Sequence, residues 1–319
     1  MRIAFMGKGG SGKTTLAAAF IRHHTRQGIP VLAVDGDLNA HLHTALRLSG
    51  APIALNEHAA AIFAALEGDR TDFQARGIVP DFGALPPSPQ SHFITPRQHD
   101  PFLARFALRE GSVTLLATGA HRAADLTHSC YHMASNPLEL VYHRLLDEAD
   151  DLVVADCTAG VDGVGTSLFM VHDLTIFVVE PTPKSTAVCA DYLKLLRGRA
   201  IPVGIIVNQV RDPTDLAYVA TQLPRSRILG AVAQSRAVRQ SEQDDPTAFD
   251  AFVAEHTPLW ARLTRRLRRH PRDWATYRAR LVAIYQRECH AWWNAYYRTP
   301  LDDLWDRDYT YERARADHR

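Results

Sequence analysis

One short stretch near the start of the chain, Gly7 to Thr14, has a composition and spacing suited to binding phosphate. Glycine has no Cβ, so backbone N–H groups in such a stretch can come close to phosphate oxygens. Lys13 would place a positive charge on those oxygens, and Thr14 would offer its hydroxyl to Mg²⁺. An apolar strand precedes the stretch and a helical pattern follows it, and a helix N-terminus favours anions. The pattern predicts a phosphate-binding loop, and the alternative is an ordinary glycine-rich turn. The residues expected to bind a nucleotide are Gly9, Gly10, Ser11, Gly12, Lys13, Thr14 and Thr15.

Two further carboxylates stand at or just after the ends of apolar strands. Asp37 stands within the segment Asp35–His41. A carboxylate near a terminal phosphate can orient water for in-line attack, so Asp37 is the candidate for that role. The alternative is that the segment only caps the next helix. Asp156 ends the apolar stretch Leu152–Asp156 and is the candidate for holding Mg²⁺ through water, together with Thr14. The alternative for Asp156 is a carboxylate that only caps a turn.

The run Lys8–Thr15, with a lysine as its first residue, resembles the deviant Walker A motif of the MinD/ParA class of P-loop ATPases. The segment Asp35–His41 is similar to switch I of CooC-type maturation ATPases, which belong to that class. The resemblance implies that the protein binds Mg-ATP and that Lys8 reaches across a homodimer interface to the partner's ATP. It also implies that Asn208, at the end of an apolar strand, reads the adenine edge.

The resemblance further implies a slow, partner-stimulated ATPase. It would form an ATP-dependent homodimer that delivers a client protein or a metal centre. Lys8 and Lys13 would then neutralise charge that develops on the phosphates, while Asp37 orients the water. The alternative within the class is a positioning ATPase that binds DNA or membrane through its basic C-terminal region. A third possibility is a regulatory subunit with negligible turnover of its own.

A candidate transition-metal site lies at His128–His132, where CooC-type proteins carry a metal-binding Cys-x-Cys pair. Cys130 and His132 are the candidate ligands. Two such pairs across a twofold axis would complete a tetrahedral Zn²⁺ or Ni²⁺ site. The alternative is that these side chains have a structural role in a segment that connects helices.

The elements that would position these residues alternate apolar strands with helical patterns. This alternation predicts an α/β P-loop fold, a mostly parallel sheet flanked by helices. Several strands are continuously apolar, as strands covered on both faces should be. The expected strands are Arg2–Met6, Val31–Val34, Val113–Thr118, Leu152–Asp156, Leu174–Glu180, Val203–Asn208 and Ile228–Val232, and the expected helices are Lys13–Gln27, Pro137–Glu148, Ser185–Arg197 and Thr214–Leu223.

The chain is expected to divide into an ATPase domain, residues 1–245, and a helical C-terminal extension, residues 246–319. A proline-rich stretch at about 51–109 interrupts the pattern and is expected to be a variable insertion with a long loop. The last residues, 311–319, are expected to be frayed. In the extension, apolar residues recur at helical spacing at Trp274, Tyr277, Leu281, Ile284 and Tyr285.

The extension also carries a run of arginines between Arg262 and Arg272. Basic segments with nearby aromatic residues can bind nucleic acid or lie on a membrane surface. Pro271 interrupts the run, however, and an acidic stretch from Asp302 to Asp308 follows it. These features favour packing against the chain itself or contact with a protein partner, and nucleic acid and membrane are the alternatives.

The overall composition is that of an ordinary globular protein, with 46% hydrophobic and 22% charged residues and a formal net charge of +1. The global charge therefore favours neither nucleic acid nor membrane. No apolar run reaches the roughly 18 residues that span a membrane. The N-terminus does not have the pattern of a signal peptide. The cysteines are scattered without a CxxC pair, so a cytoplasmic protein with reduced thiols is expected.

Overall fold

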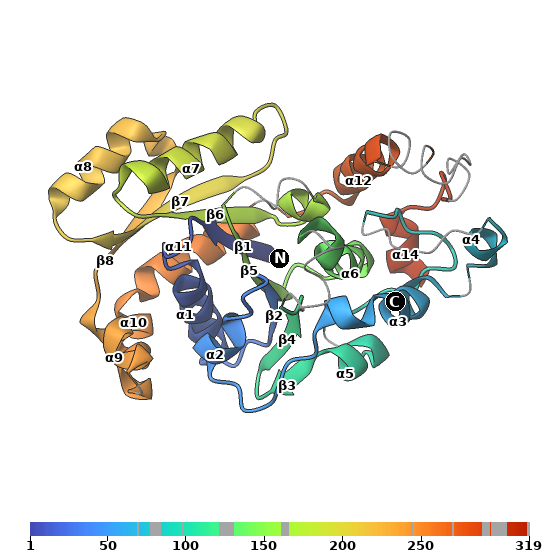
Figure 1. The fold of residues 1–319 in the computed structure, drawn as a ribbon, viewed down its shortest axis with the longest axis horizontal. Helices are drawn as coiled ribbons and strands as arrows, with labels where there is room; N and C mark the ends of the chain where they lie inside the picture. The colour runs from blue at the N-terminus through green and yellow to red at the C-terminus, as the bar shows by residue number, and fades with distance from the viewer. Residues whose placement is uncertain are drawn as a thin grey trace.

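The computed structural model describes residues 1–68, 70–76, 84–96, 99–120, 131–160, 166–243, 245–269, 271–288, 294 and 305–317. In this part of the chain an eight-stranded sheet forms the centre, with the strand order β3-β4-β2-β5-β1-β6-β7-β8 (Figure 1). The pairings are parallel except for that of β3 with β4 at one edge. The strands are β1 Arg2–Gly7, β2 Val31–Gly36, β3 Leu108–Glu110, β4 Val113–Ala117, β5 Leu152–Ala159, β6 Leu174–Val179, β7 Val203–Val210 and β8 Ile228–Ala233.

The strands expected from the sequence are all present, with small shifts at their ends, and β3 is the strand that the sequence pattern did not predict. Its three residues are too short a run to show an alternation of their own. Strand β3 forms because the chain turns back on itself and pairs with β4. Gly111 in that turn has a φ of +56°, a left-handed conformation that glycine adopts without strain.

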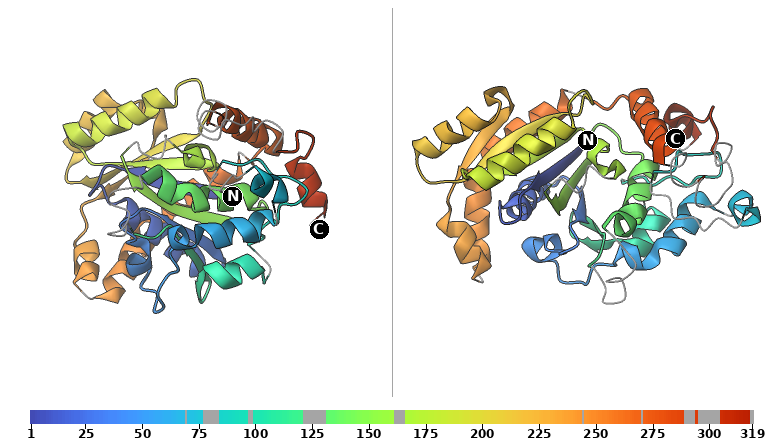
Figure 2. Two further views of the ribbon diagram at one scale, coloured as in Figure 1. Left: turned by 45° about the vertical axis from the view of Figure 1, so that its right-hand side comes forward. Right: turned by 45° about the horizontal axis from the view of Figure 1, so that its top comes forward.

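Helices cover both faces of the sheet, as the alternation of side chains along β1 requires. Ile3 and Phe5 pack on one face, while Ala4 and Met6 pack on the other. The Ile3 face is covered by α1 Lys13–Thr25, α2 Leu42–Leu46, α10 Pro246–Glu255 and α11 Thr257–Arg268, with α9 Arg236–Glu242 at its border. The opposite face is covered by α3 Ala59–Glu67, α6 Tyr131–Arg144, α7 Pro183–Leu195, α8 Pro213–Gln222 and α12 Trp274–Glu288, and Figure 2 shows the two layers from the side.

Helices α1, α7 and α8 begin and end within two residues of the predicted bounds. Pro183 and Pro213 start α7 and α8, a position where the missing N–H has no intrahelical partner to lose. Helix α6 differs from the prediction because it begins at Tyr131 and contains Pro137 in its interior. The expected start at Pro137 was therefore six residues too late.

The stretch expected to be a long loop contains short helices in its described part. They are η1 Leu55–His58, α3, α4 Thr71–Ala75 and α5 Pro101–Phe106. A buried ion pair between Glu67 of α3 and Arg144 of α6 joins the stretch to the main layer. Ile62, Phe63 and Leu66 are buried at helical spacing, a signal that the neighbouring prolines obscured.

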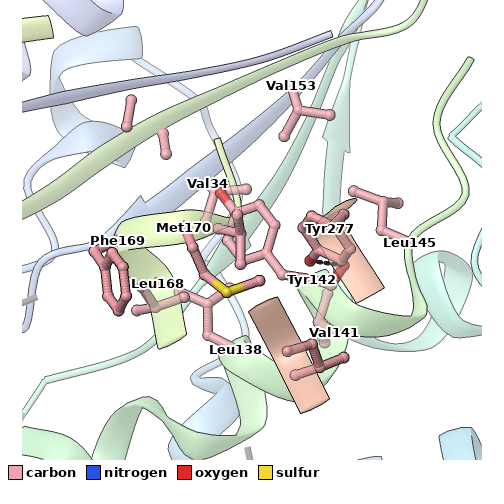
Figure 3. Close-up of a cluster of buried hydrophobic side chains, with 14 of the residues drawn as sticks. Val34, Leu138, Val141, Tyr142, Leu145, Val153, Leu168, Phe169, Met170 and Tyr277 are labelled. Atoms are coloured by element: carbon pink, nitrogen blue, oxygen red, sulfur yellow. Dashed lines mark hydrogen bonds between the residues drawn. The ribbon is translucent and has the colours of Figure 1, made fainter. Parts of the chain in front are cut away.

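The C-terminal extension packs into the core of the α/β domain. The five apolar residues expected at helical spacing in α12 are all buried. Tyr277 lies among the side chains of α6, and its hydroxyl donates to the Tyr142 carbonyl at 3.5 Å (Figure 3). The expectation of a frayed end is wrong for Tyr311, which begins α14 Tyr311–Asp317, is fully buried and donates to the His143 carbonyl at 2.9 Å.

The arginine run divides into a buried part and an exposed part. Arg272 is buried and pairs with Asp147 at 2.8 Å and Asp173 at 2.9 Å. Asp147 also pairs with the buried Arg2 at 2.8 Å. Helix α11 packs against the chain itself through Leu259, Trp260, Leu263 and Leu267, which are buried. The exposed residues are Arg262, Arg265, Arg266 and Arg268 in this helix and Arg269 after it. Among the described residues no helix is both long and apolar enough to cross a membrane.

Candidate nucleotide-binding site

The predicted phosphate loop connects β1, in the middle of the sheet, to α1. Gly10 has a φ of +82° and Gly12 a φ of +90°, conformations that strongly favour glycine. The N–H of Ser11 closes a turn onto the Lys8 carbonyl at 3.0 Å. No side chain caps α1 at Gly12. The backbone amides at the start of this helix are therefore available to an anion, which the helix dipole also favours.

The end of β7 lies directly against this loop. The Asn208 side-chain amide donates to the Ser11 carbonyl at 2.7 Å, and the Gln209 amide donates to the Gly10 carbonyl at 3.1 Å. A Cβ on Gly12 would collide with the Asn208 amide nitrogen. A residue other than glycine at this position would displace the Asn208 amide that holds the Ser11 carbonyl.

Lys13 and Asp37 form an ion pair at the floor of the site, with 2.5 Å between Nζ and Oδ2. The other oxygen of Asp37 accepts hydrogen bonds from the Asn39 backbone at 3.0 Å and side chain at 2.8 Å. Burial alone would raise the pKa of Asp37, but the hydrogen bonds from Lys13 and Asn39 outweigh it and lower this pKa. Burial alone would lower the pKa of Lys13, but the charge of Asp156 and the contact with Asp37 raise it. Both groups are therefore charged at neutral pH.

Asp35 holds the segment after β2 in place, and the sequence pattern assigned it no role. It is fully buried, and its oxygens accept the N–H of Leu42 at 2.9 Å and of Asp37 at 3.3 Å. These two bonds fix both ends of the segment that presents Asp37. Burial raises the pKa of Asp35 to about 6. An aspartate at a strand end, followed by a helix start, was the signal available in the sequence.

Asp156 lies beside Asp35 in the register of β5 with β2. It accepts a hydrogen bond from the Thr14 hydroxyl at 2.5 Å. Burial raises the pKa of Asp156 to about 7, against the opposing effects of Lys13 and Thr14. Within the described residues its other oxygen is buried and has no hydrogen-bond partner. A hard cation prefers such oxygen ligands, so Thr14 and Asp156 fit a Mg²⁺ site.

Lys13, Thr14 and Asp37 line a cleft of about 880 Å³, which lies within the size range of small-molecule sites, and Asp156 is buried behind Thr14. The cleft extends from the phosphate loop to the end of β8 and α9. Gln234, Ser235 and Arg239 line this far end. Of the predicted nucleotide-binding residues, those that line the cleft are Gly9, Gly10, Gly12, Lys13, Thr14, Thr15 and Asn208, while Ser11 is buried behind it.

Comparison with known proteins identifies the family of this chain. Residues 3–247 match the CobQ/CobB/MinD/ParA nucleotide binding domain. The chain belongs to this family. The resemblance to the MinD/ParA class is thereby confirmed, and with it the P-loop ATPase fold. The phosphate loop, Asp37 and Asp156 all lie within the matched residues.

Two similar proteins have names that refer to ATP binding or to an accessory role. An uncharacterised ATP-binding protein of Methanocaldococcus jannaschii is 29% identical over 245 residues, 76% of this chain and 88% of the relative. The carbon monoxide dehydrogenase accessory protein CooC of Rhodospirillum rubrum is 24% identical over 255 residues, 80% of this chain and 91% of CooC.

Solved structures of the class share the fold. A ParA family ATPase from Chlorobium tepidum superposes with a TM-score of 0.53 at 18% identity, covering 83% of this chain and 98% of the ATPase. The cell division ATPase MinD of Pyrococcus furiosus superposes with a TM-score of 0.52 at 17% identity, over 83% and 98% of the two chains.

The first lysine of the MinD/ParA-like motif lies apart from the other charged groups. Lys8 is not among the described residues that line the cleft. Its ammonium group donates to the Gly9 carbonyl at 2.9 Å and lies 3.4 Å from a carboxylate oxygen of Glu180, the residue after β6. The sequence pattern did not predict this contact, because it depends on the pairing of β6 with β1.

The side chains of the two candidate transition-metal ligands lie outside the part of the chain that the structure describes. Cys130 lies outside the described residues, and for His132 only the backbone position in α6 is described. The described residues contain no group of three or more His, Cys, Asp or Glu side chains arranged to bind a metal ion. The Cys130 and His132 site, like the adenine contact of Asn208, therefore remains a prediction.

Proposed function

We propose that this MinD/ParA-family protein hydrolyses ATP and acts as an ATP-dependent homodimeric switch that delivers a client protein or a metal centre. The observation that carries the proposal is the convergence of Lys13, Thr14, Asp37 and Asp156 at one end of a nucleotide-sized cleft. These are the residue types that phosphoryl transfer requires in P-loop enzymes.

In the proposed reaction ATP is the substrate, and its phosphates bind the amides of the loop and the ammonium group of Lys13. Lys13 then leaves Asp37, whose carboxylate becomes free to orient a water for in-line attack. The pairing of Lys13 with Asp37 keeps the carboxylate occupied until the phosphates compete for the lysine. Thr14 and Asp156 would hold Mg²⁺, which neutralises charge on the phosphates.

Lys8 is assigned to the other subunit of the homodimer. Its position supports this assignment, because Lys8 lies outside the lining of its own cleft and its ammonium group contacts Glu180. A lysine supplied by the partner would neutralise charge that develops during transfer. Hydrolysis would then be slow in single chains and would depend on association.

Delivery or maturation is supported by the similarity to the accessory protein CooC, which extends over 91% of its length. An ATP-driven change between single chains and homodimers is suited to capturing and releasing a client, and it produces no metabolite of its own. The client is a protein or a metal centre bound to one. ATP-dependent co-purification, scored for protein, DNA and metal, would identify it.

A second candidate function, binding of DNA, is favoured by the exposed arginines of α11. Among the described residues, Arg265, Arg266, Arg268 and Arg269 form no ion pair, so their charges are available to an anionic partner. The burial of Trp260 and the leucines of this helix argues against insertion into a membrane, since no apolar face remains for lipid.

Two variants test the proposed nucleotide chemistry. Lys13→Ala removes the nearest positive charge from the phosphates and should abolish ATP binding measured by calorimetry. Asp37→Ala should leave binding largely intact and slow hydrolysis by roughly 10²- to 10⁴-fold, the usual effect of a positioned general base. Lys184→Ala, at an exposed lysine of α7, is the control and should change neither quantity. Unchanged ATP affinity in Lys13→Ala would refute the assignment of the loop.

A further inference from the structure

The end of β7 has an irregular backbone where it meets the phosphate loop. The register of β7 with β8 shifts between Val207 and Val210. Within this bulge Gln209 has a φ of +60°, in the left-handed region that residues with a side chain rarely adopt. Such conformations persist only where their surroundings hold them, and they concentrate at functional sites.

The bulge allows two consecutive side chains to reach the same loop. In a regular strand successive side chains point to opposite faces, so only one of Asn208 and Gln209 would face the loop. Here the Asn208 amide donates to the Ser11 carbonyl at 2.7 Å, and the Gln209 amide donates to the Gly10 carbonyl at 3.1 Å. Two neighbouring amides therefore hold two neighbouring carbonyls.

Holding a carbonyl also sets the direction of the N–H in the same peptide unit, because the unit is planar and trans. The peptide that contains the Gly10 carbonyl also contains the N–H of Ser11, which closes the turn onto Lys8 at 3.0 Å. The peptide that contains the Ser11 carbonyl also contains the N–H of Gly12, at the start of α1. The end of β7 thus orients the peptide units of the loop before a nucleotide arrives.

We propose that Gln209 is a positioning residue for the phosphate loop, held in a left-handed conformation so that its side-chain amide can fix the Gly10 carbonyl. The effect is on the phosphate-binding backbone, so it is the same for any nucleoside triphosphate. This role of Gln209 rests on one part of the proposed function, namely that phosphates bind at this loop. It applies to each chain separately, whether or not the protein dimerises or has a client.

Gln209→Gly separates positioning from a merely structural role. Glycine adopts a positive φ readily, so this variant relieves the backbone while it removes the amide. We expect a melting temperature equal to or above that of the wild type, together with ATP affinity about 2- to 10-fold weaker by calorimetry, the range of one hydrogen bond. Structural importance alone would move the two quantities in the same direction.

Ala200→Gly is a matched control. Ala200 also has a left-handed backbone, with a φ of +48°, but it precedes the other end of β7. Its replacement should leave ATP affinity unchanged while the melting temperature stays equal or rises. A loss of ATP affinity in this control would overturn the proposal. Relief of backbone strain next to β7 would then be sufficient to weaken ATP binding.

Gln209→Asn is the second variant, because asparagine tolerates the left-handed region and keeps a shorter amide. We expect its ATP affinity to lie between those of the wild type and Gln209→Gly, and the ratio of ATP to GTP affinity to stay constant across all three proteins. Wild-type affinity in Gln209→Gly, equal losses in the two variants or a changed ATP to GTP ratio would each overturn the proposal. If ATP binding survives Lys13→Ala, the proposed function fails instead.

Discussion

The polar side chains of the nucleotide site contact one another. Lys13 pairs with Asp37, and the Thr14 hydroxyl donates to Asp156. A buried lysine between carboxylates would be costly unless paired. The same pairings would be exchanged for phosphate and Mg²⁺ contacts when Mg-ATP binds. Asp156 is the least well satisfied of these groups, because burial raises its pKa to about 7 and one of its oxygens has no hydrogen-bond partner within the described residues.

Asp156 gives the ligand-free protein a defined pH dependence. Its pKa is raised by burial from 3.8 to about 7, so folding favours the protonated form. Its contribution to stability is therefore present below pH 4 and is lost as pH rises through 7. Asp156→Asn should remove this loss and raise the free energy of unfolding at pH 8 by about 1–3 kcal/mol, as urea titrations at pH 5 and pH 8 would measure. Asp191→Asn, at an exposed position of α7, is the control. An unchanged pH slope in Asp156→Asn would contradict the account of this carboxyl group.

Glu180 pairs with Lys8 in the single chain. This pair should oppose movement of the Lys8 side chain toward the ATP of a partner. The pair is partly exposed, and such pairs contribute about 0.2–1 kcal/mol. Since a homodimer would break two of them, Glu180→Gln should tighten ATP-dependent association by about 2- to 30-fold in sedimentation experiments on the Asp37→Ala background. ATP affinity of the single chain should not change, because Lys8 does not line the cleft. Weaker association would show that Glu180 supports the dimer instead.

At the scale of elements, parallel strands bring the loop after β1, the segment after β2 and the end of β5 to one edge of the sheet. This arrangement could be predicted from the apolar strands and the positions of Lys13, Asp37 and Asp156. The contact of Lys8 with Glu180 could not, since it depends on which strand lies next to β1. The conformation of Gln209 could not either, because the bulge arises from the pairing of β7 with β8. Local sequence patterns do not encode strand order.

The C-terminal extension shows a second limit of prediction. The helical spacing of Trp274, Tyr277 and Leu281 indicated α12 but not the layer it covers. Phe93 of the proline-rich stretch contacts Tyr309 and Tyr311, with ring centroids 6.3 and 6.4 Å apart. These contacts join segments more than two hundred residues apart, so no local pattern could reveal them. Figure 1 shows α14 between α12 and helix α3 of that stretch.

Substitution of a buried arginine in the extension should lower the free energy of unfolding more than substitution of an exposed one. Arg272→Ala removes the buried ion-pair partner of Asp173 and one of the two buried arginines that pair with Asp147, and breaking a buried pair costs about 3–5 kcal/mol. We expect a decrease of about 3 kcal/mol in the free energy of unfolding, because Arg2 still faces Asp147. Arg269→Ala, which removes an exposed charge, should stay within about 0.5 kcal/mol of the wild type. Equal stability of the two variants in urea titrations would contradict the buried network.

At the scale of the whole molecule, the chain combines a nucleotide cleft with a lysine that lies outside it. The phosphate loop lies at the carboxyl edge of the sheet, and in the proposed homodimer this edge faces the second copy. In the proposed homodimer the terminal phosphate of each ATP lies toward the partner chain. Association and hydrolysis are then coupled, because each site lacks one positive charge until the partner supplies Lys8.

The most direct test of this account is the solution mass of Asp37→Ala with ATP and with ADP, measured by sedimentation or light scattering. Slow hydrolysis in this variant should preserve the ATP-bound state. We predict the mass of two chains with Mg-ATP and of one chain with ADP, and a weaker ATP-dependent dimer when Lys8→Ala is added. The mass of a single chain in both nucleotide states, in a variant that binds ATP, would contradict the proposed homodimeric switch.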